Sequence, residues 1–234
     1  MEQTLTTPRT VLLAGATSAA GVAITRALMR QGAQVLAVGS NQQRLDDKLS
    51  FATARFEADL GDETQVQDLA QRVHATQGRI DALLHLVGGW RGGKGIPGQT
   101  DADYQFLHRS VMTTLRHTTK VFYQDLLDSP AGRLGIVSSQ AVSTPTPSNA
   151  NYGAVKAAAE FWVQAIARDF SKQAPQAAAS IWVVKALTDQ RPQAPGSKLA
   201  GFTHVDELAA AACELLHADP AHVNGERIVL PGLE

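Results

Sequence analysis

Three side chains that together can move a proton stand close to one another in the sequence. Tyr152 and Lys156 are four residues apart, and Ser139 precedes the tyrosine by thirteen. Residues at i and i+4 share one face of a helix, so we expect the phenol and the ammonium to project into the same pocket. A nearby cation stabilises phenolate, which predicts a pKa of Tyr152 lowered towards neutrality and proton exchange with a carbonyl oxygen. The same spacing also occurs in ordinary solvated helices, and this alternative stays open on the pair alone.

The surrounding pattern alternates short apolar runs with longer amphipathic stretches. The expected strands are Thr10 to Ala14, Gln34 to Val38, Ala54 to Glu57, Ile80 to Val87, Arg133 to Val137, Ala179 to Val184 and Glu226 to Leu230. The expected helices are Ala20 to Arg30, Asp62 to Thr76, Asp101 to Leu127, Tyr152 to Phe170 and Val205 to His217. Strands that alternate with helices predict an α/β Rossmann fold, a doubly wound seven-stranded parallel sheet with helices on both faces. Ser139 then follows a buried strand.

Composition limits the kind of protein. The chain has 234 residues and a net charge of −1, so nothing indicates nucleic acid or an anionic membrane as a partner. Its one cysteine, Cys213, lies in an apolar run and is expected in the core rather than as a nucleophile. No apolar stretch approaches the length of a membrane span. We therefore expect one cytoplasmic domain over residues 1–234, with residues 1–9 flexible and no metal ion.

A loop of small residues follows the first strand and runs directly into a helix. It reads Gly15-Ala16-Thr17-Ser18-Ala19-Ala20-Gly21. Small residues let the backbone approach a pyrophosphate, and the helix N-terminus offers free N–H groups. Its position favours binding of a dinucleotide cofactor by Gly15, Thr17, Ser18, Ala19, Ala20 and Gly21. A tight turn that binds nothing is the alternative.

With these residues in view, the chain resembles the short-chain dehydrogenases/reductases from end to end. Gly15 and Gly21 match two glycines of the family pattern Thr-Gly-x-x-x-Gly-x-Gly, whereas Ala14 and Ala19 replace its threonine and its middle glycine. The resemblance implies that Tyr152 is the general acid/base, that Lys156 lowers its pKa and binds the nicotinamide ribose, and that Ser139 positions the substrate oxygen. It also implies that Asp59-Leu60 holds the adenine and that Val87, Gly88 and Gly89 border the cofactor.

Three departures from the family pattern predict an atypical proton relay and substrate loop. His85-Leu86-Val87-Gly88 replaces Asn-Asn-Ala-Gly, and His85 is either a relay substitute or a hydrogen-bonded core histidine. Val111 falls where the family has a catalytic asparagine, with Ser110 as an alternative if the register is off by one. Lys185-Ala186-Leu187-Thr188 stands where Pro-Gly usually follows the sixth strand.

The nicotinamide preference is predicted from the end of the second strand. No acid follows Val38 to hold a ribose 2′-OH, whereas Ser40, Asn41 and Arg44 could bind a 2′-phosphate. This favours NADP(H) over NAD(H).

The substrate side is less defined. Trp90, Ser139, Gln140, Val142, Asn149 and the loop Thr188 to Gly201 are expected to shape a pocket for a small carbonyl or alcohol. Gly88 to Gly93 is similar to a segment of quinonoid dihydropteridine reductase, so Trp90 either stacks on a flat, pterin-like ring or anchors the loop. The resemblance implies a homodimer or homotetramer, with Phe161, Trp162 and Phe170 either at the interface or against the sheet. A sensor or scaffold with little redox activity, and more remotely a methyltransferase, are the alternative functions.

Overall fold

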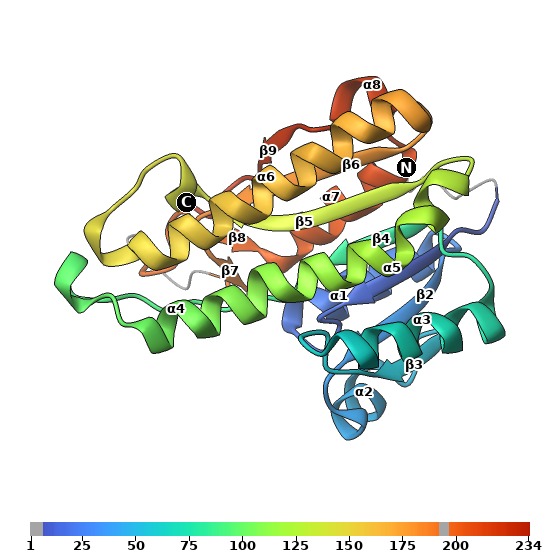
Figure 1. Cartoon of the computed structure of the whole chain (residues 1–234), viewed down its shortest axis with the longest axis horizontal. Helices are drawn as coiled ribbons and strands as arrows, with labels where there is room; N and C mark the ends of the chain where they lie inside the picture. The colour runs from blue at the N-terminus through green and yellow to red at the C-terminus, as the bar shows by residue number, and fades with distance from the viewer. Residues whose placement is uncertain (1–6, 192–196) are drawn as a thin grey trace.

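Seven parallel strands form the central sheet of the computed structural model, which describes residues 7–191 and 197–234 (Figure 1). Their order is β3-β2-β1-β4-β5-β6-β9, and each adjacent pair is parallel. The strands are β1 (Thr10–Ala14), β2 (Gln34–Gly39), β3 (Ala54–Glu57), β4 (Ala82–His85), β5 (Arg133–Ser139), β6 (Ala178–Val184) and β9 (Arg227–Val229). The seven strands and their parallel direction agree with the predicted sheet, although β4 is shorter than predicted at both ends.

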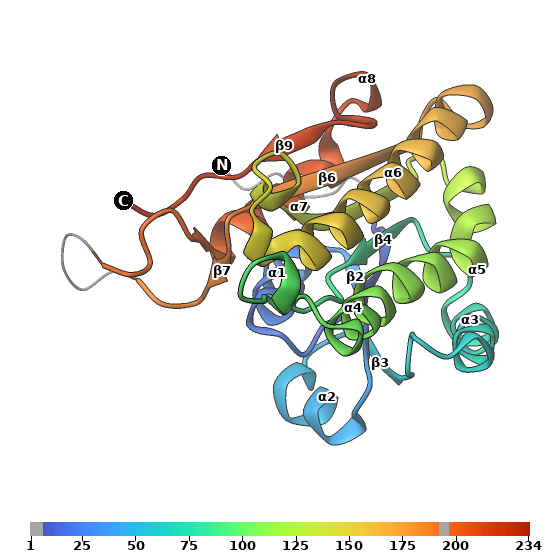
Figure 2. The ribbon, with the colours of Figure 1, turned by 60° about the vertical axis from the view of Figure 1, so that its left-hand side comes forward.

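Helices cover both faces of this sheet and create two apolar cores (Figures 1 and 2). One core includes side chains of α1 (Ala19–Arg30), α2 (Gln42–Leu49) and α7 (Val205–His217). The other includes side chains of α3 (Glu63–Gln77), α5 (Thr114–Asp128) and α6 (Ala150–Gln173). Both faces are buried, which is why the strands read as continuous apolar runs rather than as alternating ones. The predicted doubly wound α/β architecture is confirmed.

The helix predicted over Asp101 to Leu127 is interrupted. It consists of α4 (Asp101–Leu107), a π-helical segment (His108–Thr113) and α5, where the Thr114 amide donates to the carbonyl of Arg109. Hydroxyl side chains bond to carbonyls one turn back, such as Ser110 to Phe106 at 2.8 Å and Thr114 to Ser110 at 2.9 Å. Such bonds compete with the α-helical ladder, and single π turns are frequent at functional sites. The interruption lies beside the sheet edge that the active-site residues occupy.

Several short elements were not predicted. They include α2, α8 (Pro220–Val223), the parallel pair of β7 (Leu187–Thr188) with β8 (Thr203–His204), and three 3₁₀ helices (Ile96–Gly98, Gln140–Val142 and Pro147–Asn149). The expected flexible segment 1–9 lies largely outside the described residues. Arg9, however, is anchored, because its guanidinium donates to the carbonyl of Leu216. Residues 192–196 of the predicted substrate loop also lie outside the described part.

The strand order reverses between β1 and β4, which is where parallel sheets of this kind bind ligands. The loops that leave these two strands touch: a Cβ built on Gly15 would lie 3.1 Å from the carbonyl carbon of Leu86 and from the amide of Val87. Gly15 also has a φ of +81°, which side chains disfavour. A glycine is therefore required where the expected phosphate loop leaves the sheet.

Candidate active site

The fold brings Ser139, Tyr152 and Lys156 to one cavity of about 840 Å³. Ser139 is the last residue of β5, and Tyr152 and Lys156 occupy successive turns at the start of α6. The ammonium of Lys156 is buried, donates to the carbonyl of Val137 at 2.8 Å and lies 6.0 Å from the centre of the Tyr152 ring. The hydroxyl, phenol and ammonium thus share a pocket, as their spacing predicted.

Burial works against charge at this cluster. It raises the pKa of Tyr152 above its ordinary value, while hydrogen bonding with Ser139 acts in the opposite direction. Burial also lowers the pKa of Lys156 to about 8, although the charge of Glu160 favours the ammonium. The expectation that the lysine would bring the pKa of Tyr152 towards neutrality is therefore wrong for this structure. A phenol that keeps its proton is suited to act as a proton donor.

His85 and Val111 lie behind the lysine. His85 is buried, as expected for a core histidine; its Nε2 has no hydrogen-bond partner among the described residues, whereas hydrogen bonds with the backbone of His85 and Thr114 act to raise its pKa. Burial and the charge of Lys156 lower the pKa of His85 to about 3, which keeps it neutral. A Cβ at Gly88 would lie 3.8 Å from Lys156 Nζ and 3.9 Å from Val111 Cγ2. Val111 is therefore beside the lysine, whereas Ser110 bonds back to its own helix.

A second cavity of about 300 Å³ lies on the other side of the expected phosphate loop. The predicted cofactor residues divide between the two. The larger cavity is bordered by Ser18, Ala19, Ala20, Gly88, Gly89, Tyr152 and Lys156, and the smaller by Gly15, Thr17, Ser40, Asp59, Leu60 and Val87. Three predicted residues, Gly21, Asn41 and Arg44, border neither. Residues of the expected phosphate loop thus border both cavities. This arrangement suits a dinucleotide, which carries a ring system at each end of a central pyrophosphate.

The loop residues fit a pyrophosphate at the start of α1. Ser18 is the N-cap, and its hydroxyl accepts from the amide of Gly21 at 3.0 Å. The first-turn amides of Ala19 and Ala20 border the larger cavity and are suited to an anion. Gly21 also has a packing role: a Cβ there would lie 2.4 Å from the carbonyl oxygen of Ala16. The absence of a side chain lets the helix approach the loop closely.

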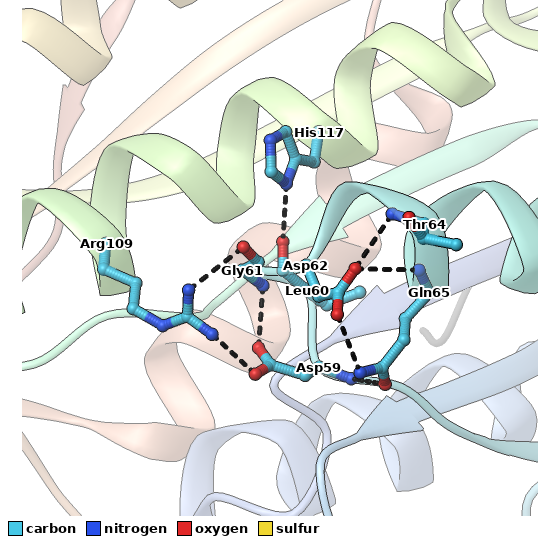
Figure 3. A network of polar contacts seen from close by, with 8 residues as sticks. All are labelled: Asp59, Leu60, Gly61, Asp62, Thr64, Gln65, Arg109 and His117. Atoms are coloured by element: carbon cyan, nitrogen blue, oxygen red, sulfur yellow. Dashed lines mark hydrogen bonds and ion pairs between the residues drawn. The ribbon is translucent and has the colours of Figure 1, made fainter.

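The smaller cavity is bordered by an ion pair between Arg109 and Asp59, which the sequence did not predict. The guanidinium of Arg109 donates to Asp59 Oδ2 at 2.6 Å and to the carbonyl of Gly61 at 3.1 Å (Figure 3). The other oxygen of Asp59 accepts from the Gly61 amide at 2.8 Å. Arg109 belongs to the π-helical segment and also borders the cavity. No local signal in the sequence links residue 109 to Asp59, because the contact depends on how the helix crosses the loop.

The segment after β2 was expected to bind a 2′-phosphate through Ser40, Asn41 and Arg44. In the structure, the polar side chains near the smaller cavity are partly different ones. Ser40 borders the cavity, but the side-chain oxygen of Asn41 accepts from the Arg44 amide at 2.9 Å and caps α2. Arg44 itself is exposed. A cation that was not predicted, Lys48, reaches back from α2 and donates to the carbonyl of Thr17 at 3.1 Å. The helix α2, absent from the prediction, is what places it there.

The expected substrate residues Trp90, Ser139, Gln140, Asn149 and Thr188 all border the larger cavity. Trp90 is 62% exposed, and its indole N–H donates to Asn149 Oδ1 at 3.3 Å. The glycine-rich loop is tied to the segment before α6, for example by the Gly93 amide to Ser148 at 2.9 Å. Val142 does not border the cavity, whereas Lys185 does. The loop and the catalytic helix thus form one wall.

A family model described as short chain dehydrogenase matches residues 9–180, which is most of the chain. The chain belongs to that family.

Curated relatives are similar at modest identity. A 2,3-dihydro-2,3-dihydroxybenzoate dehydrogenase from Bacillus subtilis (strain 168) is 26% identical over 166 residues, which cover 68% of this chain and 63% of that protein. The match thus spans just under two thirds of that relative. Nodulation protein G of Rhizobium meliloti (strain 1021) is 26% identical over 237 residues, covering 97% of this chain and 96% of that protein.

Solved structures share the fold. A gluconate 5-dehydrogenase from Burkholderia cenocepacia J2315, in complex with NADP and tartrate, superposes with a TM-score of 0.80 at 20% identity, covering 96% of this chain and 94% of that one. An apo short chain oxidoreductase from Pseudomonas aeruginosa PAO1, said to contain an atypical catalytic center, gives 0.81 at 18% identity and 96% coverage of both chains. Within the part of this chain that the structure describes, none of the helices has the length and hydropathy of a membrane span.

Proposed function

We propose that this protein interconverts a small carbonyl compound and its alcohol by hydride transfer, with NADP(H) as the favoured cofactor. The observation that carries the proposal is the convergence of Ser139, Tyr152 and Lys156 on the cavity that the phosphate loop also borders. The proposal places the nicotinamide end of the cofactor in the larger cavity and its adenine end in the smaller.

Each group at the site has a distinct task. Bound nicotinamide would supply or accept the hydride. Ser139 holds the substrate oxygen by a hydrogen bond, and Tyr152 donates its proton to that oxygen during reduction. The pKa of Tyr152 is raised by burial, so the phenol is protonated at neutral pH and ready to donate. The ammonium of Lys156 stabilises the negative charge left on the phenol oxygen and would hold the nicotinamide ribose of a bound cofactor.

The preference for NADP(H) rests on charge around the smaller cavity. No carboxylate directly follows β2 in the sequence, and Ser40 lines the cavity there, although the Glu57 carboxylate at the end of β3 accepts from the Gln42 amide at 3.2 Å. Lys48 reaches Thr17, which borders the same cavity, so its ammonium is near the expected ribose. Arg44 and Asn41 are kept as outer contacts, since neither borders the cavity. The neighbour that holds NADP supports binding of this cofactor class by the fold.

The substrate is proposed to be a small molecule that contains a flat ring. Trp90 offers an exposed indole at the cavity, and Gln140, Asn149 and Thr188 surround the reacting end with polar groups. The named relatives act on different compounds, so the identity of the substrate depends on a screen.

The remaining proposals concern the whole protein. We place it in the cytoplasm as one NAD(P)-binding domain, with neither nucleic acid nor a membrane as partner, and as a homodimer or homotetramer. Phe170 is fully buried in its own core, whereas Phe161 is 74% exposed on α6 and is available to a second copy. Sedimentation of the purified protein gives the oligomer size.

Tyr152→Phe tests the proposed reaction. Removing the phenol hydroxyl removes the proton donor but keeps the ring, so NADPH-dependent reduction of carbonyl compounds should fall at least a hundredfold. The dissociation constant for NADPH, measured by fluorescence titration, should change less than threefold. Turnover that persists in this variant would rule out the assigned mechanism. Cofactor binding without turnover by the wild type would instead favour a sensor or scaffold.

A further inference from the structure

A buried ion pair lies behind the catalytic lysine and takes no part in either cavity. Glu160 is 5% exposed, and its carboxylate accepts from the hydroxyl of Ser138 at 2.5 Å. The guanidinium of Arg227, from β9, donates to the two oxygens of Glu160 at 2.7 and 3.3 Å. Neither Glu160 nor Arg227 borders either of the two cavities described above. The reaction proposed above makes no use of this pair.

Stability alone does not account for such a pair. Taking a carboxylate out of water carries a large desolvation penalty, and its attraction to one cation often does no more than offset that penalty. Apolar side chains of similar size frequently serve a core equally well. A buried carboxylate with all its partners in place therefore points to a role for its charge.

The position of Glu160 connects that charge to the active site. Tyr152, Lys156 and Glu160 follow one another at intervals of four along α6, and so lie on one face of the helix. Two consecutive residues of β5 hold the two charged groups. The Val137 carbonyl accepts from Lys156, and the Ser138 hydroxyl donates to Glu160. Ser139, the next residue, faces the substrate cavity. One strand end therefore sets the positions of the lysine, the carboxylate and the substrate.

The other titratable and charged groups around Lys156 do not supply this charge. His85, from β4, is neutral because burial lowers its pKa to about 3. Tyr152 is neutral because burial raises its pKa. Arg227, from β9, is a cation held against Glu160. Among the described residues, Glu160 is the carboxylate whose charge favours the ammonium of Lys156 against the effect of burial.

We propose that Glu160 is a positioning residue of the active site, whose buried carboxylate, held by Ser138 and Arg227, keeps the neighbouring Lys156 cationic. The inference rests on the proposed function in giving that cation a task at the nicotinamide ribose and the tyrosine. The proposal extends the active site to β9, because the positive charge of Arg227 partly offsets the effect of the Glu160 carboxylate on Lys156.

The test compares Glu160→Gln with Arg227→Gln, two near-isosteric changes on opposite sides of the ion pair. The readout is the titration midpoint of Lys156, followed by NMR on protein labelled with ¹³C at lysine Cε and assigned with Lys156→Met. Glu160→Gln should move the midpoint down by at least half a pH unit. Arg227→Gln should move it up, because Glu160 is then less neutralised. Glu160→Asp, which keeps the charge, should restore most of the wild-type midpoint.

Opposite shifts support the proposal, and a purely structural role predicts two destabilised proteins with the same midpoint. Midpoints that are unchanged, or that move together, would overturn it. Arg227 is partly exposed, so its variant keeps the test available if Glu160→Gln fails to fold. The titration needs no substrate: shifts without turnover on any carbonyl compound would remove the proposed reaction and leave Glu160 as the group that sets the charge of Lys156.

Discussion

At the residue scale, the site is governed by the conflict between burial and charge. Lys156 and Tyr152 both lose water on folding, and burial shifts their pKa values in opposite directions, each towards the neutral form. The tyrosine therefore keeps its proton at neutral pH, while the lysine is close to losing one. Activity should depend on pH through the lysine before it depends on the tyrosine.

Reductive activity should fall as pH rises through about 8. The pKa of Lys156 is lowered to about 8, so the ammonium is present below that pH and is lost above it. If the cation is required, kcat/KM should approach a tenfold loss for each further pH unit. Lys156→Arg keeps a charge that does not titrate in this range, so its profile should be flat to pH 10, although lower. A flat wild-type profile, or the same fall in both proteins, would contradict this.

His85 should make the fold sensitive to acid. Its pKa is about 3 in the folded chain and 6.5 as an ordinary value, so the unfolded state binds the proton first as pH falls. The resulting loss of stability begins near pH 6.5 and reaches about 2 kcal/mol between pH 7 and pH 5.

Urea unfolding of the wild type and of His85→Asn, at both pH values, isolates this effect. Every other titrating group is common to the two proteins, so the variant should lose about 2 kcal/mol less than the wild type on acidification. Equal losses in the two proteins would show that His85 is not the buried neutral group inferred here.

At the scale of elements, the helices and strands that the sequence predicted are those with a clear hydrophobic periodicity. The elements that it missed depend on tertiary contacts. The seven strands and their parallel direction were accessible because continuous apolar runs alternate with helices, and helix α7 begins and ends where predicted. The π-helical segment was not accessible, since hydroxyl-to-carbonyl bonds such as that of Ser110 leave no periodic signal. The short, polar α2 was missed because few apolar residues mark its face.

The residues of the candidate site also fall into those that the sequence could identify and those that it could not. Ser139, Tyr152 and Lys156 were identifiable because their spacing along a strand and a helix fixes their relation. Arg109 and Lys48 were not, because each contacts a residue more than thirty positions away. For Gly21, the part that sequence could not show is the close packing of helix against loop, which depends on tertiary contact.

Helix α2 should set the cofactor preference through Lys48. Its ammonium is held at Thr17 beside the smaller cavity, whereas Arg44 on the same helix is directed to solvent. Lys48→Met should weaken NADPH binding roughly five- to tenfold, as expected for a partly screened charge pair, and change NADH binding little.

Fluorescence titrations with both cofactors measure this preference, with Lys172→Met, in the last turn of α6, as the matched control. The control should change both affinities less than twofold. A loss of equal size for NADPH and NADH in Lys48→Met would place the lysine away from a 2′-phosphate.

At the scale of the whole molecule, the sheet edge organises the chemistry. The loops after β1 and β4 meet at the point where strand order reverses, and the loops after β5 and β6 complete the larger cavity. The phosphate loop divides the two cavities, so the cofactor is expected to lie across the edge with its reactive ring beside Tyr152. The central claim is that a hydride passes there to a carbonyl carbon while Tyr152 supplies the proton.

The measurement that tests this claim most directly is the transfer of deuterium from NADPH deuterated at the reactive carbon, with a carbonyl substrate identified by screening. The account predicts one deuterium on the alcohol carbon of the product, detected by mass spectrometry, and loss of that product in Tyr152→Phe while NADPH still binds. An alcohol without deuterium, or labelled product formed equally by Tyr152→Phe, would contradict it.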